Sequence, residues 1–268
     1  MTATDPSLPF TPVLIAGAPR SGTHLLHSLV CTSGRVNRFI PEFYQLYYLV
    51  EAYLHTLRLA PDIGVAPFAD IEDCTRHHFD LVRATLTAAW ERLDRPEILA
   101  VKECSLTPYL GLMARHMPDL RCIVILRDPR DTIASQVRET EKRLGQRPAG
   151  FVDAAILRMR QLYGSVIRES SGPLGSRLLG INYEELVAGK EFGRLAAFLG
   201  VDDLDPGQLW QRTSFDITTY DHLSVASDLW GAPMTDAGVG RWKNTLTEAE
   251  ADRIWQSTYG MCLSFSAL

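Results

Sequence analysis

Residues 16–26, AGAPRSGTHLL, have the residue types and spacing of an anion-binding loop. Gly17 and Gly22 form a GxxxxG pattern directly after the apolar run 13–17. A strand that passes through such a loop into a helix points backbone N–H groups and the positive end of the helix dipole at one small volume. Arg20, Ser21 and Thr23 add one cation and two hydroxyl donors. We therefore expect this loop to bind a phosphate-like group.

The residues after the second glycine argue against a magnesium nucleotide. Nucleotide hydrolases place a lysine there, followed by a serine or threonine that ligates magnesium. Here the two positions hold Thr23 and His24. A neutral imidazole is a poor ligand for a hard cation that prefers oxygen. The sequence thus predicts an anion site that works without a metal, although GxxxxG by itself is also compatible with a simple tight turn.

A second cation follows another apolar run, at residues 122–126. Arg127 precedes Asp128-Pro129, and Ser135 comes eight residues after Arg127. Asp128 and Pro129 are explained as the N-cap and first residue of a helix. An arginine at that helix start faces the unfavourable end of the dipole unless an anion lies between them. Arg127, with Ser135, is therefore a candidate for a second phosphate site.

These motifs resemble those of the sulfotransferases that use 3′-phosphoadenosine 5′-phosphosulfate (PAPS), and most closely the tyrosylprotein and bacterial branch. PRSGT is similar to the family's 5′-phosphosulfate loop, and the Arg127/Ser135 pair to its 3′-phosphate site. The resemblance implies PAPS as co-substrate, 3′,5′-ADP (PAP) as product, and no metal.

Two later segments extend the likeness. Tyr183-Glu184-Glu185-Leu186 is similar to a family segment whose tyrosine lies against adenine, and residues 238–244, GVGRWKN, are similar to a loop that closes over the 3′-phosphate. The Arg-Lys-Gly that cytosolic members carry before that loop is replaced by Thr235-Asp236-Ala237, so Arg241 and Lys243 are the expected substitutes. Tyr183 is also compatible with an aromatic ring that packs on the sheet at a helix start, and Trp242 is expected in the core. The donor-binding residues implied by the resemblance are Arg20, Ser21, Gly22, Thr23, His24, Arg127, Ser135, Tyr183, Arg241 and Lys243.

The resemblance implies three catalytic residues: Glu42, Arg20 and Lys102. Glu42 matches the glutamate that serves as base in the tyrosylprotein branch, although Pro-Glu is also an ordinary helix start. Lys102, at the end of the apolar run 98–102, either stabilises the departing phosphate or pairs with an acid such as Glu103. The cytosolic branch has a catalytic histidine near here, and residues 98–110 contain none, which favours Glu42. His24 is the alternative base.

Hydrophobic periodicity predicts the strands and helices that carry these residues. Four apolar runs, 13–17, 98–102, 122–126 and 177–181, are predicted as buried parallel strands, each followed by a helical pattern. We expect the helices at residues 22–32, 108–116, 129–144, 150–169, 183–200 and 247–258. Residues 42–59 and 72–93 form a helical insertion after the first βα unit. The predicted fold is a single α/β domain over residues 1–268, a P-loop-like three-layer fold with a central parallel sheet, with its ligands at the carboxyl ends of the strands.

The composition limits the classes of partner and the cellular compartment that we expect for this protein. The net charge is -5, which argues against nucleic acid, and no apolar run approaches the roughly 20 residues of a membrane span. Five scattered cysteines without a CxxC pair indicate a reduced, cytoplasmic protein. Cys74, His77 and His78 lack a complementary ligand pair, so a solvated helix face is expected there and no metal site. A homodimer is compatible with the sequence.

The predicted activity is O-sulfotransfer from PAPS to a hydroxyl of a small molecule, a sugar or tyrosine, with a small molecule favoured. The aromatic residues of 43–53 and the segment 201–236 are expected to form the acceptor pocket or its lid. Two other classes stay open. A P-loop nucleotide kinase needs the missing lysine, whereas a noncatalytic nucleotide-binding module keeps the loop without the base.

Overall fold

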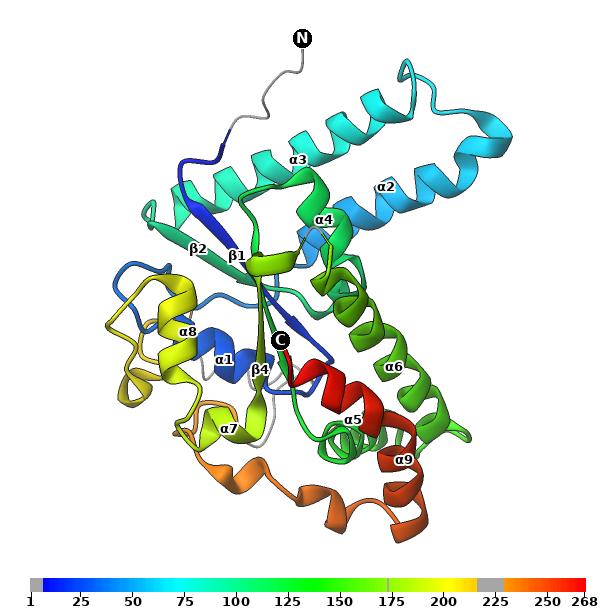
Figure 1. Ribbon diagram of the computed structural model, residues 1–268, viewed down its shortest axis with the longest axis vertical. Coiled ribbons are helices and arrows are strands. Elements are labelled where there is room, and N and C mark those ends of the chain that lie inside the picture. Colours follow the sequence, from blue (N-terminus) through cyan, green and yellow to red (C-terminus); the bar gives the residue numbers. More distant parts are fainter. Residues whose placement is uncertain (1–6, 173, 216–228) are drawn as a thin grey trace.

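The centre of the molecule is a parallel four-stranded sheet in the order β2-β1-β3-β4 (Figure 1). The computed structural model describes residues 7–172, 174–215 and 229–268. The strands are β1 (Thr11–Gly17), β2 (Ile98–Lys102), β3 (Arg121–Leu126) and β4 (Leu178–Asn182). Their valine, leucine and isoleucine runs are buried on both faces, as parallel strands covered by helices require. In the register, Lys102 pairs with Ile15 and Gly17 with Ile125, so the strand ends that carry the site lie side by side.

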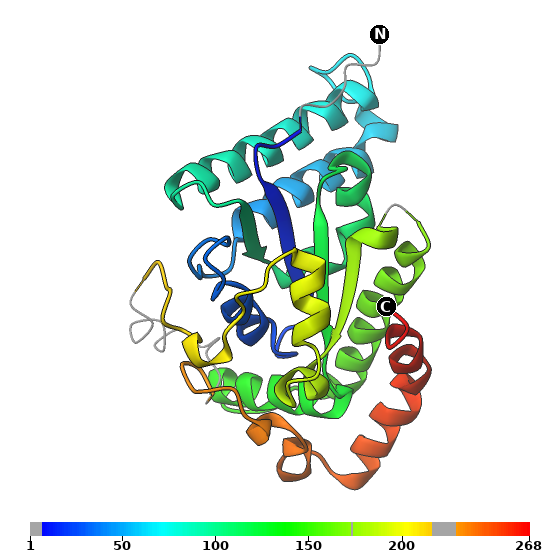
Figure 2. The same cartoon turned by 60° about the vertical axis from the view of Figure 1, so that its left-hand side comes forward.

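Alternate residues of each strand feed two cores. Val13 and Ile15 face α1 (Thr23–Val30) and α8 (Phe192–Leu199), whereas Leu14 and Ala16 face the opposite layer. Figures 1 and 2 show that layer, which holds α4 (Leu110–His116), α5 (Pro129–Leu144), α6 (Phe151–Ser170) and α9 (Glu248–Phe265). The predicted three-layer α/β class with a central parallel sheet is thereby confirmed.

The predicted helical insertion is confirmed as a long hairpin between α1 and β2. Its helices are α2 (Tyr44–Ile63) and α3 (Ile71–Arg92), which extend together from one end of the molecule (Figure 1). Asp70 caps α3 by accepting a hydrogen bond from the Asp73 amide at 2.8 Å. Leu46 and Val50 of α2 bury their side chains in the core. The base of the hairpin is therefore fixed beside the ends of the strands.

Three helices differ clearly from the sequence-based expectation. The helix α2 continues beyond residue 59, through Pro61, to Ile63. The helix expected over residues 183–200 is two helices, α7 (Tyr183–Val187) and α8, because the chain turns at Gly189 with a φ of 79°. The last helix extends beyond residue 258 to Phe265, whose buried ring packs 5.5 Å from that of Tyr163. Short 3-10 helices complete the chain: η1 (Cys104–Tyr109), η2 (Gly175–Arg177), η3 (Pro206–Gln208), η5 (Asp236–Gly238) and η6 (Arg241–Asn244). Within the described ranges, none of the helices has the length and apolar character needed to cross a membrane.

Candidate active site

The loop between β1 and α1 has the conformation of an anion cradle. Arg20 has a φ of 74° and Gly22 a φ of 99°, so the chain folds back on itself before α1 starts at Thr23. No side chain caps α1, and its first turn contains no acidic residue. The amides of that turn lack intrahelical partners, and Gly22, Thr23 and His24 line a cavity. The amides and the dipole therefore favour an anion at this point.

The loop is held from behind by hydrogen bonds to the core. The Gly17 amide donates to Thr107 Oγ1 and the Ala18 amide to Tyr163 Oη, both at 3.0 Å. Ser21 is fully buried and its hydroxyl donates to Ala18 O at 2.7 Å. In this structure Ser21 thus closes the loop and does not line the cavity.

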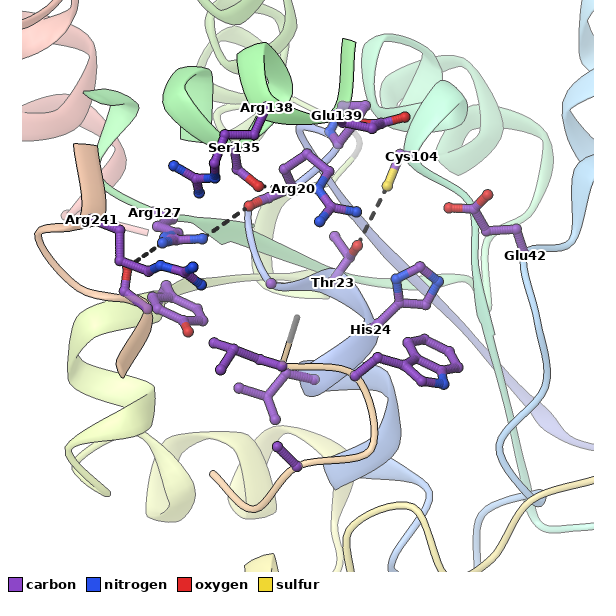
Figure 3. Close-up of a pocket in the computed structure, with 18 of the residues that line it drawn as sticks. Arg20, Thr23, His24, Glu42, Cys104, Arg127, Ser135, Arg138, Glu139 and Arg241 are labelled. Carbon is purple, nitrogen blue, oxygen red and sulfur yellow. Dashed lines mark hydrogen bonds between the residues drawn. The ribbon is translucent and has the colours of Figure 1, made fainter. Parts of the chain in front are cut away.

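The cavity of about 390 Å³ lies over the carboxyl ends of the strands and collects most of the predicted site residues. Figure 3 shows the cationic groups gathered on one side and Glu42 on the other. Lys102 and Lys243 are not among the lining residues: Lys102 is buried behind Glu42, and Lys243 is exposed with its Nζ 5.8 Å from the Trp242 ring. The lining includes Arg20, Gly22, Thr23, His24, Glu42, Arg127, Ser135, Tyr183 and Arg241 of the predicted set.

The cationic side of the cavity is built around Arg127. Its Nη1 donates to Arg20 O at 3.3 Å, its Nη2 donates to Gly238 O, and its guanidinium lies 4.8 Å from the Tyr183 ring centre. Its buried Nε has no hydrogen-bond partner within the described ranges. Arg20 Nε donates to Ser135 Oγ at 3.2 Å, which brings together side chains predicted for two different phosphates. An anion would satisfy the unpartnered Nε.

Sequence reasoning missed further charged residues on the cavity-lining face of α5. Arg138, Glu139 and Lys142 line the cavity together with Ser135. Arg138 and Lys142 lie three and seven residues beyond Ser135, a spacing that places them on one helix face. That spacing, applied to a helix already predicted over 129–144, was the available signal.

Glu42 and Lys102 form a buried ion pair. Lys102 Nζ donates to Glu42 Oε1, and Tyr44 Oη donates to Glu42 Oε2. The Lys102 side chain is 0% exposed and that of Glu42 is 13% exposed. Burial by itself raises the pKa of Glu42, but the charge and hydrogen bond of Lys102 outweigh it, and the pKa lies below its usual value. Glu42 is therefore ionised at neutral pH, and it is the acid with which Lys102 pairs.

Glu103 places a second carboxyl group at the cavity. Its Oε1 accepts a hydrogen bond from the Ser105 amide at 2.9 Å at the start of η1. Its Oε2 is buried and has no hydrogen-bond partner in the described part of the chain. Burial, with the nearby charge of Glu42, raises the pKa of Glu103. The two carboxyl groups thus differ in acidity.

His24 lies on the other wall, against aromatic rings. Its ring is edge-on to Trp230 at 5.1 Å, and its buried Nε2 lacks a hydrogen-bond partner among the described residues. Burial, and then the charge of Lys102, lower the pKa of His24 well below its usual value. The imidazole is therefore neutral at pH 7.

The region expected to hold the acceptor is only partly at the cavity. Tyr44 lines it, whereas Phe43, Tyr47 and Tyr53 pack into the core and Tyr48 is exposed. From the segment 201–236, the lining residues are Trp210, Leu229, Trp230 and residues 232–235. Residues 216–228, which belong to the expected lid, lie outside the described residues.

Cys104 and Cys74 lie in different surroundings. Cys104 lines the cavity with its Sγ 3.5 Å from Thr23 Oγ1. Cys74, expected on a solvated helix face, is buried, while His77 is exposed. Across residues 7–172, 174–215 and 229–268, no cluster of three or more His, Cys, Asp or Glu is arranged to hold a metal ion.

Comparisons with known proteins agree with this fold. The model of the sulfotransferase family matches residues 12–206. The sulfotransferase domain from the curacin biosynthetic pathway superposes with a TM-score of 0.61 at 17% identity, covering 95% of this chain and 99% of that one. The sulfotransferase domain of the Synechococcus PCC 7002 olefin synthase gives 0.53 at 19% identity, covering 98% and 97%. A mouse sulfotransferase complexed with PAP gives 0.54 at 15%, covering 94% and 86%. Among curated protein sequences no significant match is found.

Proposed function

Because the chain belongs to the sulfotransferase family, we propose that it transfers the sulfonate group of PAPS to a hydroxyl group of an acceptor. The observation that carries this proposal is the composition of the one cavity described above. At one end it joins an uncapped helix start to Arg20, Arg127 and Arg241, and at the other end it presents the ionised Glu42. The first end suits an anionic donor, and the second suits a group that gives up a proton.

The residues present fit the two phosphate groups of PAPS. The 5′-phosphosulfate would lie at the start of α1, where Arg20, Thr23 and the loop amides offer donors. The 3′-phosphate would bind Arg127, Ser135 and Arg241, with the unpartnered Arg127 Nε among its donors. Donor binding would then exchange the Arg20–Ser135 hydrogen bond for bonds to the ligand. A mouse sulfotransferase of similar fold is complexed with PAP, which supports PAPS as the donor.

The other residues predicted to bind PAPS have less direct roles in this proposal. Tyr183 lines the cavity beside Arg127 and would contact adenine. His24 lines the sulfonate end as a neutral group. Ser21 would act through the shape of the loop. Lys243 would reach a phosphate only after moving from the Trp242 ring.

In the proposed reaction Glu42 is the base. The acceptor oxygen forms a bond to sulfur, the bond between sulfur and the phosphate oxygen breaks, and the proton of the acceptor hydroxyl passes to Glu42. General-base help of this kind contributes about 100- to 10,000-fold. Arg20 offsets the negative charge that grows on the departing phosphate, and Lys102 acts on the site through its ion pair with Glu42. Neutral His24, whose Nε2 has no hydrogen-bond partner among the described residues, is the alternative base.

The walls of the acceptor side favour a small, uncharged and largely apolar alcohol. The Trp210 indole N–H donates to Ala232 O at 2.8 Å, so the ring contributes apolar surface to the cavity. Trp230 lies 5.1 Å from it. The ionised Glu42 would repel an anionic acceptor.

Transfer of labelled sulfonate from PAPS, in the presence of EDTA, tests the proposal. The acceptors are an apolar alcohol, a sugar and a tyrosine peptide. We expect transfer to the apolar alcohol, and a loss of about 10-fold or more in donor affinity for Arg20→Ala. The matched control is Arg58→Ala, which removes an exposed arginine paired with Glu51 on α2. ATP used in preference to PAPS, or PAP binding without any transfer, would contradict the proposal.

A further inference from the structure

The segment 235–244 brings Arg241 to the cavity, and Trp242 packs against the core, whereas the residues before Arg241 have few apolar contacts. Residues 235–237 are exposed, and Val239 is 43% exposed. Thr235-Asp236-Ala237 stands where the cytosolic members carry Arg-Lys-Gly, and Lys243 does not line the cavity. Arg241 is thus the cation that this segment presents to the ligand, and its position depends on polar contacts.

Asp131 makes two of those contacts. It lies in the first turn of α5 and is only 1% exposed. Its Oδ2 accepts a hydrogen bond from the Gly240 amide at 2.7 Å, and its Oδ1 accepts one from the Trp242 amide at 2.8 Å. These amides flank Arg241. Asp128 already caps α5, so Asp131 is not needed as a cap.

The same helix start holds the segment at a third point. Arg127 Nη2 donates to Gly238 O. Gly238 itself packs so closely on Tyr183 that an added Cβ would collide with Tyr183 Oη. Arg130 lies 4.7 Å from the Trp242 ring centre and adds a contact just beyond Arg241. The beginning of α5 therefore determines where Arg241 lies relative to Arg127 and Ser135.

We propose that Asp131 is a positioning residue that gives the site its selectivity for a 3′-phosphorylated nucleotide, by holding Arg241 beside Arg127. This inference rests on the proposed function. Asp131 does not line the cavity. A carboxylate near a phosphate is unfavourable on charge alone, and both of its oxygens are engaged by amides, so it acts through the segment and not as a ligand.

The test compares PAP with AMP, which lacks the 3′-phosphate, in calorimetric titrations. Asp131→Asn keeps the size of the side chain but turns one acceptor oxygen into an NH₂ group that cannot accept from an amide. We expect PAP affinity to fall about 10- to 100-fold and AMP affinity to stay within about 2-fold. The matched control, Asp236→Asn, removes an exposed carboxylate from the same segment and is expected to bind PAP as the wild type does.

A double-mutant cycle separates positioning from a general structural role. If Asp131 acts through Arg241, Asp131→Asn has little further effect on PAP affinity in an Arg241→Ala background. Thermal unfolding of each variant without nucleotide shows whether the fold is intact. Additive losses in the cycle, or an equal loss of PAP and AMP affinity in Asp131→Asn, would overturn the inference.

The outcome for the wild type keeps the two proposals apart. A wild-type protein that prefers ATP to PAP contradicts the proposed function itself. A wild-type protein that prefers PAP to AMP, combined with an Asp131→Asn variant that keeps this preference, leaves the proposed function intact and contradicts only the role of Asp131.

Discussion

Replacing Glu42 by glutamine should affect activity and stability separately, because Glu42 has two roles in this account. As the base it contributes about 100- to 10,000-fold to the rate, so kcat of Glu42→Gln should fall by that factor. As the partner of Lys102 it neutralises a charge that is 0% exposed. Breaking a buried pair costs about 3–5 kcal/mol. Glutamine keeps a carbonyl oxygen for Lys102 Nζ, so we expect a loss of unfolding free energy near the lower end of that range.

A second substitution separates the two effects. In Glu42→Gln/Lys102→Met no unpaired charge stays buried, so most of the unfolding free energy should return. The rate should not return, since the base is still missing. Denaturant unfolding measures the stability, and kcat at saturating PAPS and acceptor measures the chemistry. Less than about a tenfold fall in kcat for Glu42→Gln would refute the role of Glu42 as base. A double variant as unstable as the single one would refute the role assigned to the ion pair.

Three further predictions follow from single contacts. Burial raises the pKa of Glu103 above its usual 4.5, so the folded protein loses stability relative to the unfolded chain as the pH rises above that value. The unfolding free energy of Glu103→Gln should therefore increase relative to that of the wild type as the pH rises. A difference between the two that does not change with pH would contradict this. His24→Gln should keep kcat within about 10-fold, because Glu42 takes the proton, and a loss of about 100-fold or more would transfer that role to His24. Gly22→Ala should abolish PAP binding, since the new Cβ would lie 2.5 Å from the Tyr183 ring. The control is Gly64→Ala, which is also at positive φ but in open space. Equal PAP binding by the two variants would argue against a steric clash at Gly22.

Much of the fold was predictable because its strands are covered on both faces. The runs at 13–17, 98–102 and 122–126 are apolar without alternation, and that pattern gave their type and nearly their ends. The break after Val187 was missed because YEELVAGKEFGRLAAFL has helical spacing throughout, and Gly189 alone marks the turn. The hydrophobic spacing within one segment thus predicts the type of secondary structure of that segment, but not where a helix is interrupted.

Residue types and spacing predicted the site where a residue's neighbours in sequence are also its neighbours in space, and the family resemblance was needed to add residues from other segments. Arg20 and Thr23 belong to one loop, so their type and spacing were sufficient. Asp131 looks like an ordinary acid in a first helical turn, and its contacts with residues 240 and 242 exist only in the folded chain. The aromatic residues of 43–53 gave a misleading signal because Phe43, Tyr47 and Tyr53 pack into the main core.

The central claim is that the loop after β1 holds a sulfonated or phosphorylated adenosine without a divalent ion. Calorimetric titration of the wild-type chain with PAP in EDTA, repeated with AMP, and with ATP and magnesium, tests it most directly. We expect PAP to bind most tightly, with an affinity that magnesium does not change. Tighter binding of magnesium ATP, or no detectable binding of PAP, would contradict it.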